Sequence, residues 1–258
     1  MRWDPLQYGR YAGERGRPFF ELIARIEADS PENVVDLGCG PGDLTVSLAQ
    51  RWPEAFVRGI DSSPEMIAEA PSDGAVQFSV GTAEDFSAAE VDVLVSNALL
   101  QWVPTHRELI VRWARELNED GWLAFQVPAN FDAPSHALMR ELAGSARWAD
   151  RLGGVLRGSD STAPPTEYLE LLAGAGLEVD AWRTEYVHVL EGDDPVLEWV
   201  RGTGLRPVLA ALSPEDAAAF SAEYAALLRE AYPRREFGTP FPFARTFVVA
   251  RRRELDAT

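Results

Sequence analysis

The chain has 258 residues and a formal charge of −17, because its 41 acidic residues outnumber its 24 basic ones. Phosphate backbones and anionic lipid repel so acidic a protein, which argues against nucleic acid and membranes as partners. All the basic residues are arginines, so the chain has no lysine for Schiff-base chemistry or for a phosphate-binding loop. A hydrophobic content of 46% is enough to form a globular core.

Short apolar runs alternate with amphipathic stretches over the first half of the chain. The runs predict strands over 34–37, 56–60, 76–80, 91–95 and 122–127. Between them, the pattern predicts helices over 44–52, from Ser63 onward with Pro64 in the first turn, and over 107–117. Strands that alternate with helices indicate an α/β fold, in which helices cover both faces of a parallel sheet.

The alternation breaks after Pro128. Helices are predicted over 131–148, 165–173, 194–202 and 213–231, and strands over 177–190 and 247–250. We expect one domain, 1–258, in which helical inserts at roughly 130–165 and 192–240 form a cap over the carboxyl edge of the sheet. Ligands bind at that edge in open α/β folds. Residues 1–30 are expected to form a lid segment.

The single cysteine, Cys39, cannot form an internal disulfide or a paired metal or redox site. This favours a reducing, cytoplasmic location. The first 18 residues lack the apolar core of a signal peptide, and no later run is long enough to cross a bilayer. No ligand cluster points to a metal, and both a monomer and a homodimer remain open.

A glycine-rich turn, Gly38-Cys39-Gly40-Pro41-Gly42, follows the first predicted strand. Glycines allow backbone to approach a ligand closely. The dinucleotide fingerprint would need glycine at 43, where Asp43 stands, and this argues against NAD and FAD. Asp36 suits a cationic amine or sulfonium, and Asp61 is placed to accept hydrogen bonds from ribose hydroxyls. These features describe an adenosine-like ligand without phosphates.

With this turn, D-S-S-P-E-M-I at 61–67 and S-N-A-L-L-Q-W at 96–102, the chain resembles class I S-adenosylmethionine-dependent methyltransferases. Further segments narrow the resemblance to methyltransferases of trans-aconitate: W-D-P-L-Q-Y at 3–8, E-R-G-R-P-F at 14–19, N-A-L-L-Q-W-V-P-T-H at 97–106, D-A-W-R-T-E-Y at 180–186, T-G-L-R-P at 203–207 and F-V-V-A-R-R at 247–252. The resemblance implies a Rossmann-like, seven-stranded sheet of order 3-2-1-4-5-7-6 with an antiparallel last strand.

The resemblance also implies a site for S-adenosyl-L-methionine across the strand ends. The residues it assigns to this cofactor are Asp36, Gly38, Cys39, Gly40, Gly42, Asp61, Ser62, Met66, Thr82, Ala83, Glu84, Asp85, Asn97, Ala98 and Gln101. Many relatives have an acidic residue where Thr82 aligns, so Glu84 or Asp85 is an alternative contact for the adenine amine. Cys39 is expected to be a small turn residue, because no base adjoins it.

The expected substrate is trans-aconitate or a related small polycarboxylate, which would become a monomethyl ester. A carboxylate is already anionic at neutral pH, so no general base is required; Trp102 and His106 are the candidate catalytic residues. Arginine pairs bidentately with carboxylates. The substrate-binding candidates are Arg17, Arg183, Arg206 and Arg245, with Tyr8, Tyr11, Trp102, Tyr186 and His188 closing the pocket.

Two other functions remain open on the sequence. One is the methylation of another small molecule, because the cap that selects the substrate varies on a shared fold. The other is a non-catalytic protein that binds an S-adenosyl ligand. For each candidate arginine, a surface salt bridge is an equally simple interpretation.

Overall fold

A computed structural model describes residues 12–72, 74–156, 158 and 161–253. These residues form two compact units, each described separately below. The first comprises Met1–Pro128, Thr162–Thr184 and Arg245–Thr258, and the second comprises Ala129–Ser161 and Glu185–Ala244. The second unit includes most of both predicted inserts, and its role as a cap stays a prediction.

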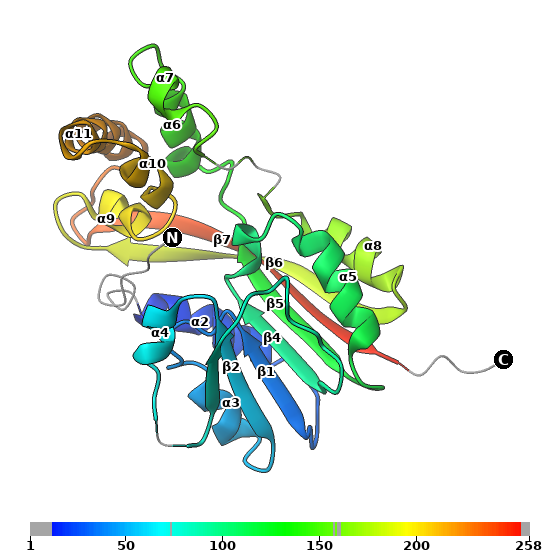
Figure 1. The fold of residues 1–258 in the computed structure, drawn as a ribbon. Helices are drawn as coiled ribbons and strands as arrows, with labels where there is room; N and C mark the ends of the chain where they lie inside the picture. Colours follow the sequence, from blue (N-terminus) through cyan, green and yellow to red (C-terminus); the bar gives the residue numbers. More distant parts are fainter. Residues whose placement is uncertain (1–11, 73, 157, 159–160, 254–258) are drawn as a thin grey trace. The chain divides into compact units, whose positions relative to one another are not determined.

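One seven-stranded sheet organises the described chain (Figure 1). Its strands are β1 (Asn33–Leu37), β2 (Phe56–Asp61), β3 (Gln77–Val80), β4 (Val93–Asn97), β5 (Trp122–Pro128), β6 (Leu177–Leu190) and β7 (Thr239–Arg252). The spatial order is β3-β2-β1-β4-β5-β7-β6, with β7 antiparallel to β5. This confirms the predicted α/β fold and strand order.

Helices of the first unit cover the sheet. They are α2 (Ala12–Ile23), α3 (Val46–Arg51), α4 (Pro64–Ala68), α5 (His106–Glu116) and α8 (Pro165–Ala173), with a 3-10 turn η1 (Leu100–Trp102). α5 packs against α8, and α2 against β5. Trp113 of α5 and Tyr168 of α8 are fully buried, with Trp113 against Phe86 and Tyr168 against Phe125.

Helix α2 was not predicted from the sequence, which contains Gly13, Gly16 and Pro18. It forms because Phe19, Leu22 and Ile23 bury their side chains in the first unit. Part of the predicted lid segment, 1–30, therefore contributes to the core. Residues 1–11 lie outside the described chain.

The second unit is mainly helical, with α6 (Pro134–Ala143), α7 (Ala149–Leu152), α9 (Pro195–Arg201), α10 (Arg206–Ala211) and α11 (Pro214–Ala231). The single helix predicted over 131–148 is wrong, because α6 ends at Gly144 and a turn separates it from α7. Trp148 lies after that break and is fully buried, donating its indole N–H to Glu223 of α11 at 3.1 Å. Helix α10 was also not predicted.

No described helix has the length and apolar character needed to cross a membrane.

Asn130 is the buried side chain that fastens the start of the second unit to β7. Its Oδ1 accepts the Ala244 N–H at 2.7 Å, and its Nδ2 donates to the Ala244 carbonyl at 2.8 Å. Asn130→Ala would leave the Ala244 N–H buried without a partner, a loss of about 1–3 kcal/mol, whereas the Ala244 carbonyl would still accept the Ala129 N–H at 2.8 Å. We expect a clearly lower urea midpoint by circular dichroism, whereas the exposed control Asp132→Ala should unfold like the wild type. Equal midpoints for both variants would contradict this role.

Candidate active site

The glycine turn follows β1 at the carboxyl edge of the sheet. Gly38, Gly40 and Gly42 have positive φ values of 82°, 57° and 82°. A Cβ on Gly38 would lie 2.8 Å from Leu99, and one on Gly42 would lie 2.5 Å from the Phe78 ring. A Cβ on Gly40 would meet nothing within 4 Å. Two of the glycines are therefore required by packing, and the third faces open space.

Asp61, at the end of β2, holds this turn. One carboxylate oxygen accepts the Gly40 N–H at 2.9 Å, and the other accepts the Ser63 N–H at 2.9 Å. Ser63 in turn begins α4, because its hydroxyl accepts the Met66 N–H at 3.3 Å. The carboxylate thus connects the turn after β1 to the helix after β2.

Asp36 is the buried carboxylate next to the turn. It is 2% exposed, and its Oδ2 accepts the Thr45 hydroxyl at 2.7 Å. Its Oδ1 is buried and has no hydrogen-bond partner among the described residues. Burial raises the pKa of Asp36 to about 7, the Thr45 hydrogen bond opposes this shift, and the charge of Asp61 adds to it. A cationic ligand next to this carboxyl group would favour its ionised form.

Cys39 is buried within the turn. Burial is the main cause that raises the pKa of its thiol, and the charges of Asp36 and Asp61 add to the effect. The thiol therefore stays protonated at neutral pH, as a small turn residue would.

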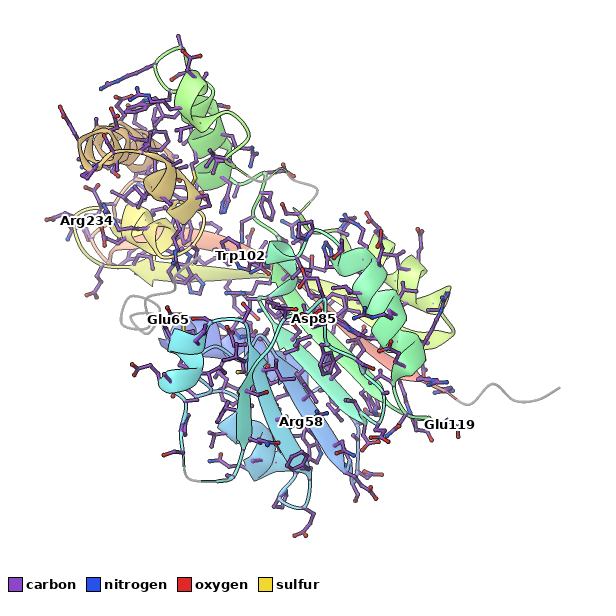
Figure 2. The ribbon with its side chains drawn as sticks, in the orientation of Figure 1. Arg58, Glu65, Asp85, Trp102, Glu119 and Arg234 are labelled. Atoms are coloured by element: carbon purple, nitrogen blue, oxygen red, sulfur yellow. The ribbon has the colours of Figure 1, made fainter. Side chains whose placement is uncertain are left out.

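The remaining predicted cofactor residues lie in the first unit around the neighbouring strand ends. Met66 is buried and Ser62 is exposed. In the loop after β3, Ala83 is part of the core, while the exposed Thr82 donates its hydroxyl to Asp85 at 2.7 Å. Asp85 is labelled in Figure 2. Glu84 is exposed in the same loop. Their contacts with adenine stay a prediction.

A chain of side-chain hydrogen bonds links β4, β5 and β7 near the carboxyl ends of β4 and β5. Gln126 donates to Asn97 Oδ1 at 2.6 Å, and Arg245 Nη1 donates to Gln126 Oε1 at 2.9 Å. Gln126 is 0% exposed and Arg245 is 4% exposed. Arg245 lies opposite Pro128, at the carboxyl end of β5. A guanidinium is therefore buried at the edge of the sheet where ligands bind.

Beside this chain, Ala98 adopts a positive φ of 59°. Its carbonyl accepts the side-chain amide of Gln101, which lies in η1, at 2.5 Å. Trp102 ends η1 and is half-buried (Figure 2). Sequence reasoning missed Gln126 and Thr45; the signal for Gln126 was a polar residue inside the apolar run 122–127.

His106 is buried in the core of the first unit. It is 1% exposed, with Nδ1 3.0 Å from the Val103 carbonyl and Nε2 3.0 Å from the Tyr168 hydroxyl. The Ala163 N–H donates to the same hydroxyl at 3.1 Å. The carbonyl requires Nδ1–H, so Nε2 accepts the tyrosine proton. Burial lowers the pKa of His106. These contacts support a structural role that joins α5 to α8.

The substrate-binding candidates fall in different places. Arg17 lies on α2 and pairs with Glu21 at 2.8 Å, and Arg183 is exposed on β6. Tyr186, His188 and Arg206 belong to the second unit, where the His188 ring stacks on Trp199 at 4.8 Å. Tyr8 and Tyr11 lie outside the described residues. Their contacts with a substrate stay predictions.

The strand order, the glycine turn and its carboxylates define the class I methyltransferases. A family model described as a methyltransferase domain matches residues 11–181, and the chain belongs to this family. Among curated proteins, it is similar to those named trans-aconitate 2-methyltransferase. One from Streptomyces coelicolor is 54% identical, covering 98% of this chain and 87% of its own length, and one from Rhodococcus jostii is 53% identical, covering 96% and 98%.

Solved structures share the fold at low identity. The YcgJ protein of Bacillus subtilis is 17% identical with a TM-score of 0.59, covering 92% of this chain and 99% of its own. A putative methyltransferase from Bacillus halodurans is 14% identical with a TM-score of 0.57, covering 92% and 100%.

The glycine turn offers a matched pair of substitutions. Gly40→Ala imposes only the cost of a left-handed alanine, about 1 kcal/mol. Gly42→Ala adds a clash with the Phe78 ring. We expect Gly42→Ala to lower the free energy of unfolding by at least about 1 kcal/mol more than Gly40→Ala, measured by urea titration. Equal losses would mean that Phe78 moves aside without cost.

Proposed function

We propose that this chain transfers a methyl group from S-adenosyl-L-methionine to a carboxylate of trans-aconitate, giving a monomethyl ester and S-adenosylhomocysteine. The observation that carries the cofactor is the buried Asp36 oxygen without a partner, beside a turn whose Gly40 faces open space. The substrate is supported by relatives at 52–54% identity that are named for trans-aconitate.

The residues present suit this cofactor. Asp36 would face its cationic methionine portion, and Asp61 would accept hydrogen bonds from the ribose while holding Gly40. Met66, Ser62 and the loop 82–85 would surround the adenine. When bound, the cofactor supplies an electrophilic methyl group on a sulfonium.

The chain's task is then to align the acceptor. A carboxylate oxygen forms the new bond to the methyl carbon as the carbon–sulfur bond breaks, and the electron pair remains on sulfur. The acceptor carries no proton at neutral pH, so no general base is needed. The buried His106, with both ring nitrogens engaged in the core, is consistent with such a mechanism. Arg245 would orient an acceptor carboxylate from the edge of the sheet.

The direct test incubates the purified protein with S-adenosylmethionine and trans-aconitate and follows the products by mass spectrometry. We expect a product heavier by one methylene, formed together with S-adenosylhomocysteine. Cofactor binding without ester formation would contradict the proposed substrate, and turnover only on phenols or amines would contradict carboxylate methylation.

Cofactor affinity should rise with pH. The pKa of Asp36 near 7 means that part of the cofactor-free protein is protonated there at neutral pH. A cationic ligand favours the carboxylate, so the Kd for S-adenosylmethionine should fall as pH rises through about 7 and level off above it. Calorimetry across about pH 6 to 8 measures this.

Two variants test the assignment to Asp36. Asp36→Asn should abolish this pH dependence, whereas Asp43→Asn, at an exposed position of the same turn, should keep it.

The raised pKa of Asp36 also affects the stability of the folded protein. Since the folded-state pKa is raised, the stabilisation from Asp36 is complete below its unfolded value near 4 and is lost as pH rises through about 7. If Asp36→Asn unfolds with the same dependence on pH as the wild type, that dependence belongs to another group.

A further inference from the structure

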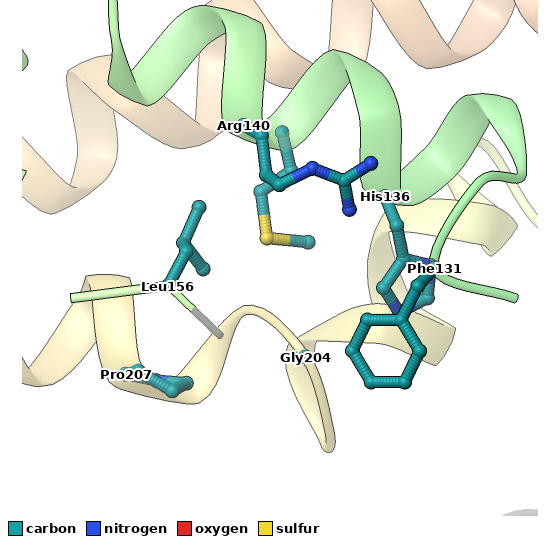
Figure 3. Close-up of a pocket in the computed structure, with 7 residues that line it drawn as sticks. Phe131, His136, Arg140, Leu156, Gly204 and Pro207 are labelled. Atoms are coloured by element: carbon teal, nitrogen blue, oxygen red, sulfur yellow. The ribbon is translucent and has the colours of Figure 1, made fainter. Parts of the chain in front are cut away.

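Figure 3 shows a cavity of the second unit, between α6 and the segment that leads into α10. It measures about 20 Å³, which is room for roughly one water molecule. Neither a tricarboxylate nor a nucleoside fits such a space. A pair of amide side chains in the first unit, Asn97 and Gln126, instead has the polar atoms that recognition of an anionic acceptor requires.

The hydrogen bonds of Gln126 allow one orientation of its amide. A guanidinium can only donate, so the atom of Gln126 that lies 2.9 Å from Arg245 Nη1 must be the oxygen, Oε1. The nitrogen, Nε2, then faces Asn97 and can only donate, so Asn97 must present its own oxygen, Oδ1, at 2.6 Å. Gln126 is fully buried, so water does not compete for these contacts. The charge of Arg245 therefore determines the orientation of both amides.

This orientation leaves Asn97 Nδ2 as the atom of the pair that can meet a ligand. Asn97 is half-buried at the end of β4, and no hydrogen bond with another described residue uses its Nδ2. The backbone beside it is fixed as well, because the Ala98 N–H donates to the Gln126 carbonyl at 3.0 Å. A neutral donor with two N–H groups is thus held in a rigid position.

Asn97 lies on the same face of the sheet as the carboxylate of the candidate cofactor site. Asp36 is paired with Val95 of β4, and Asn97 lies two residues beyond Val95, so both side chains leave the sheet on one face. Asn97 is paired with Gln126, and Arg245 follows on the same face of β7. Along β1, β4, β5 and β7, this face therefore presents a carboxylate, two amides and a guanidinium in that order.

We propose that Gln126 is a positioning residue, which holds Asn97 so that Asn97 Nδ2 donates to the carboxylate that is methylated. The inference rests on the proposed function and names the residues that orient its acceptor. The N–H would bind the oxygen that does not attack, which fixes the plane of the carboxylate and leaves the attacking oxygen open.

A neutral donor suits this position better than a cation does. The acceptor loses negative charge as it forms the bond to the methyl carbon. A cation at the reacting carboxylate would therefore stabilise the ground state more than the transition state. An amide orients the carboxylate with less of this cost, and a sulfonium does not repel it.

Gln126→Glu should reverse the orientation of Asn97. The new carboxylate still accepts from Arg245, but its second oxygen cannot donate, so Asn97 must turn its Nδ2 toward position 126 and present Oδ1 to the ligand. We expect trans-aconitate to bind roughly tenfold more weakly, because an acceptor atom then faces an anion. Gln77→Glu adds the same charge at an exposed position of β3 and should bind like the wild type.

Asn97→Asp tests the donor and keeps the contact with Gln126. One oxygen can still accept from Gln126 Nε2, while the other replaces the N–H groups. We expect KM for trans-aconitate to rise roughly tenfold or more, whereas the affinity for S-adenosylmethionine stays the same or increases, because the added charge repels the acid and attracts the sulfonium. A purely structural role would weaken both ligands alike. This half-buried position also keeps the test available if Gln126→Glu fails to fold.

A double-mutant cycle with Asn97→Ala separates the effect that Gln126 exerts through Asn97 from any effect through Arg245. Trans-aconitate is titrated into each protein saturated with S-adenosylhomocysteine, where no turnover occurs. A loss of roughly tenfold from Gln126→Glu in the wild type, and a much smaller loss in Asn97→Ala, supports the positioning role even if no ester forms. An equal loss in both backgrounds overturns it, and so does wild-type affinity in Asn97→Asp, whether or not the wild type makes the ester. A wild type that does not bind trans-aconitate contradicts both the substrate and the positioning role.

Discussion

The hydrogen bond from the Gly40 N–H to Asp61 is the contact on which the rest of the candidate site depends. It joins the turn after β1 to the end of β2, where the Gly38 and Cys39 N–H groups also donate to the Ile60 carbonyl at 2.7 and 3.1 Å. The second oxygen of the same carboxylate accepts the Ser63 N–H, so the start of α4 is fixed as well. The Asp61 side chain and the β1–β2 pairing therefore fix the spacing between two neighbouring strand ends together, which is the spacing that a ligand lying across them must match.

Charges of opposite sign lie at two places along the strand ends of the first unit. Two carboxylates, Asp36 and Asp61, lie beside the turn; burial raises the pKa of Asp36 and of the Cys39 thiol, and the charge of Asp61 adds to both shifts. At the end of β5, by contrast, the ionised group is the guanidinium of Arg245, held by Gln126. The first unit thus has a region that attracts a cation next to β1 and a region that attracts an anion next to β5. Methyl transfer from a sulfonium to a carboxylate requires both.

The sequence was sufficient for the features that depend on local pattern. Alternating apolar runs located the strands, and the glycine spacing located the turn. It failed where tertiary burial overrides local preference: α2 contains glycines and an internal proline, yet Phe19 and Leu22 hold it in the core. It also could not show that His106 meets Tyr168, because 62 residues separate them and only the packing of α5 on α8 brings them together.

The same reasoning explains why arginines were the hardest residues to assign. In a chain with this excess of acid, many exposed arginines pair with a carboxylate, as Arg25 does with Asp180. An ion pair at the surface adds little to stability, and its presence does not rule out a contact with substrate. What distinguishes a recognition arginine is the absence of solvent or of an acidic partner, and both depend on the fold. Arg245 is distinguished by its burial inside a hydrogen-bonded chain of side chains. A sequence context such as W-R-T or F-A-R-T-F can suggest an arginine as a candidate. Only the packing around its guanidinium distinguishes a salt bridge from a substrate contact.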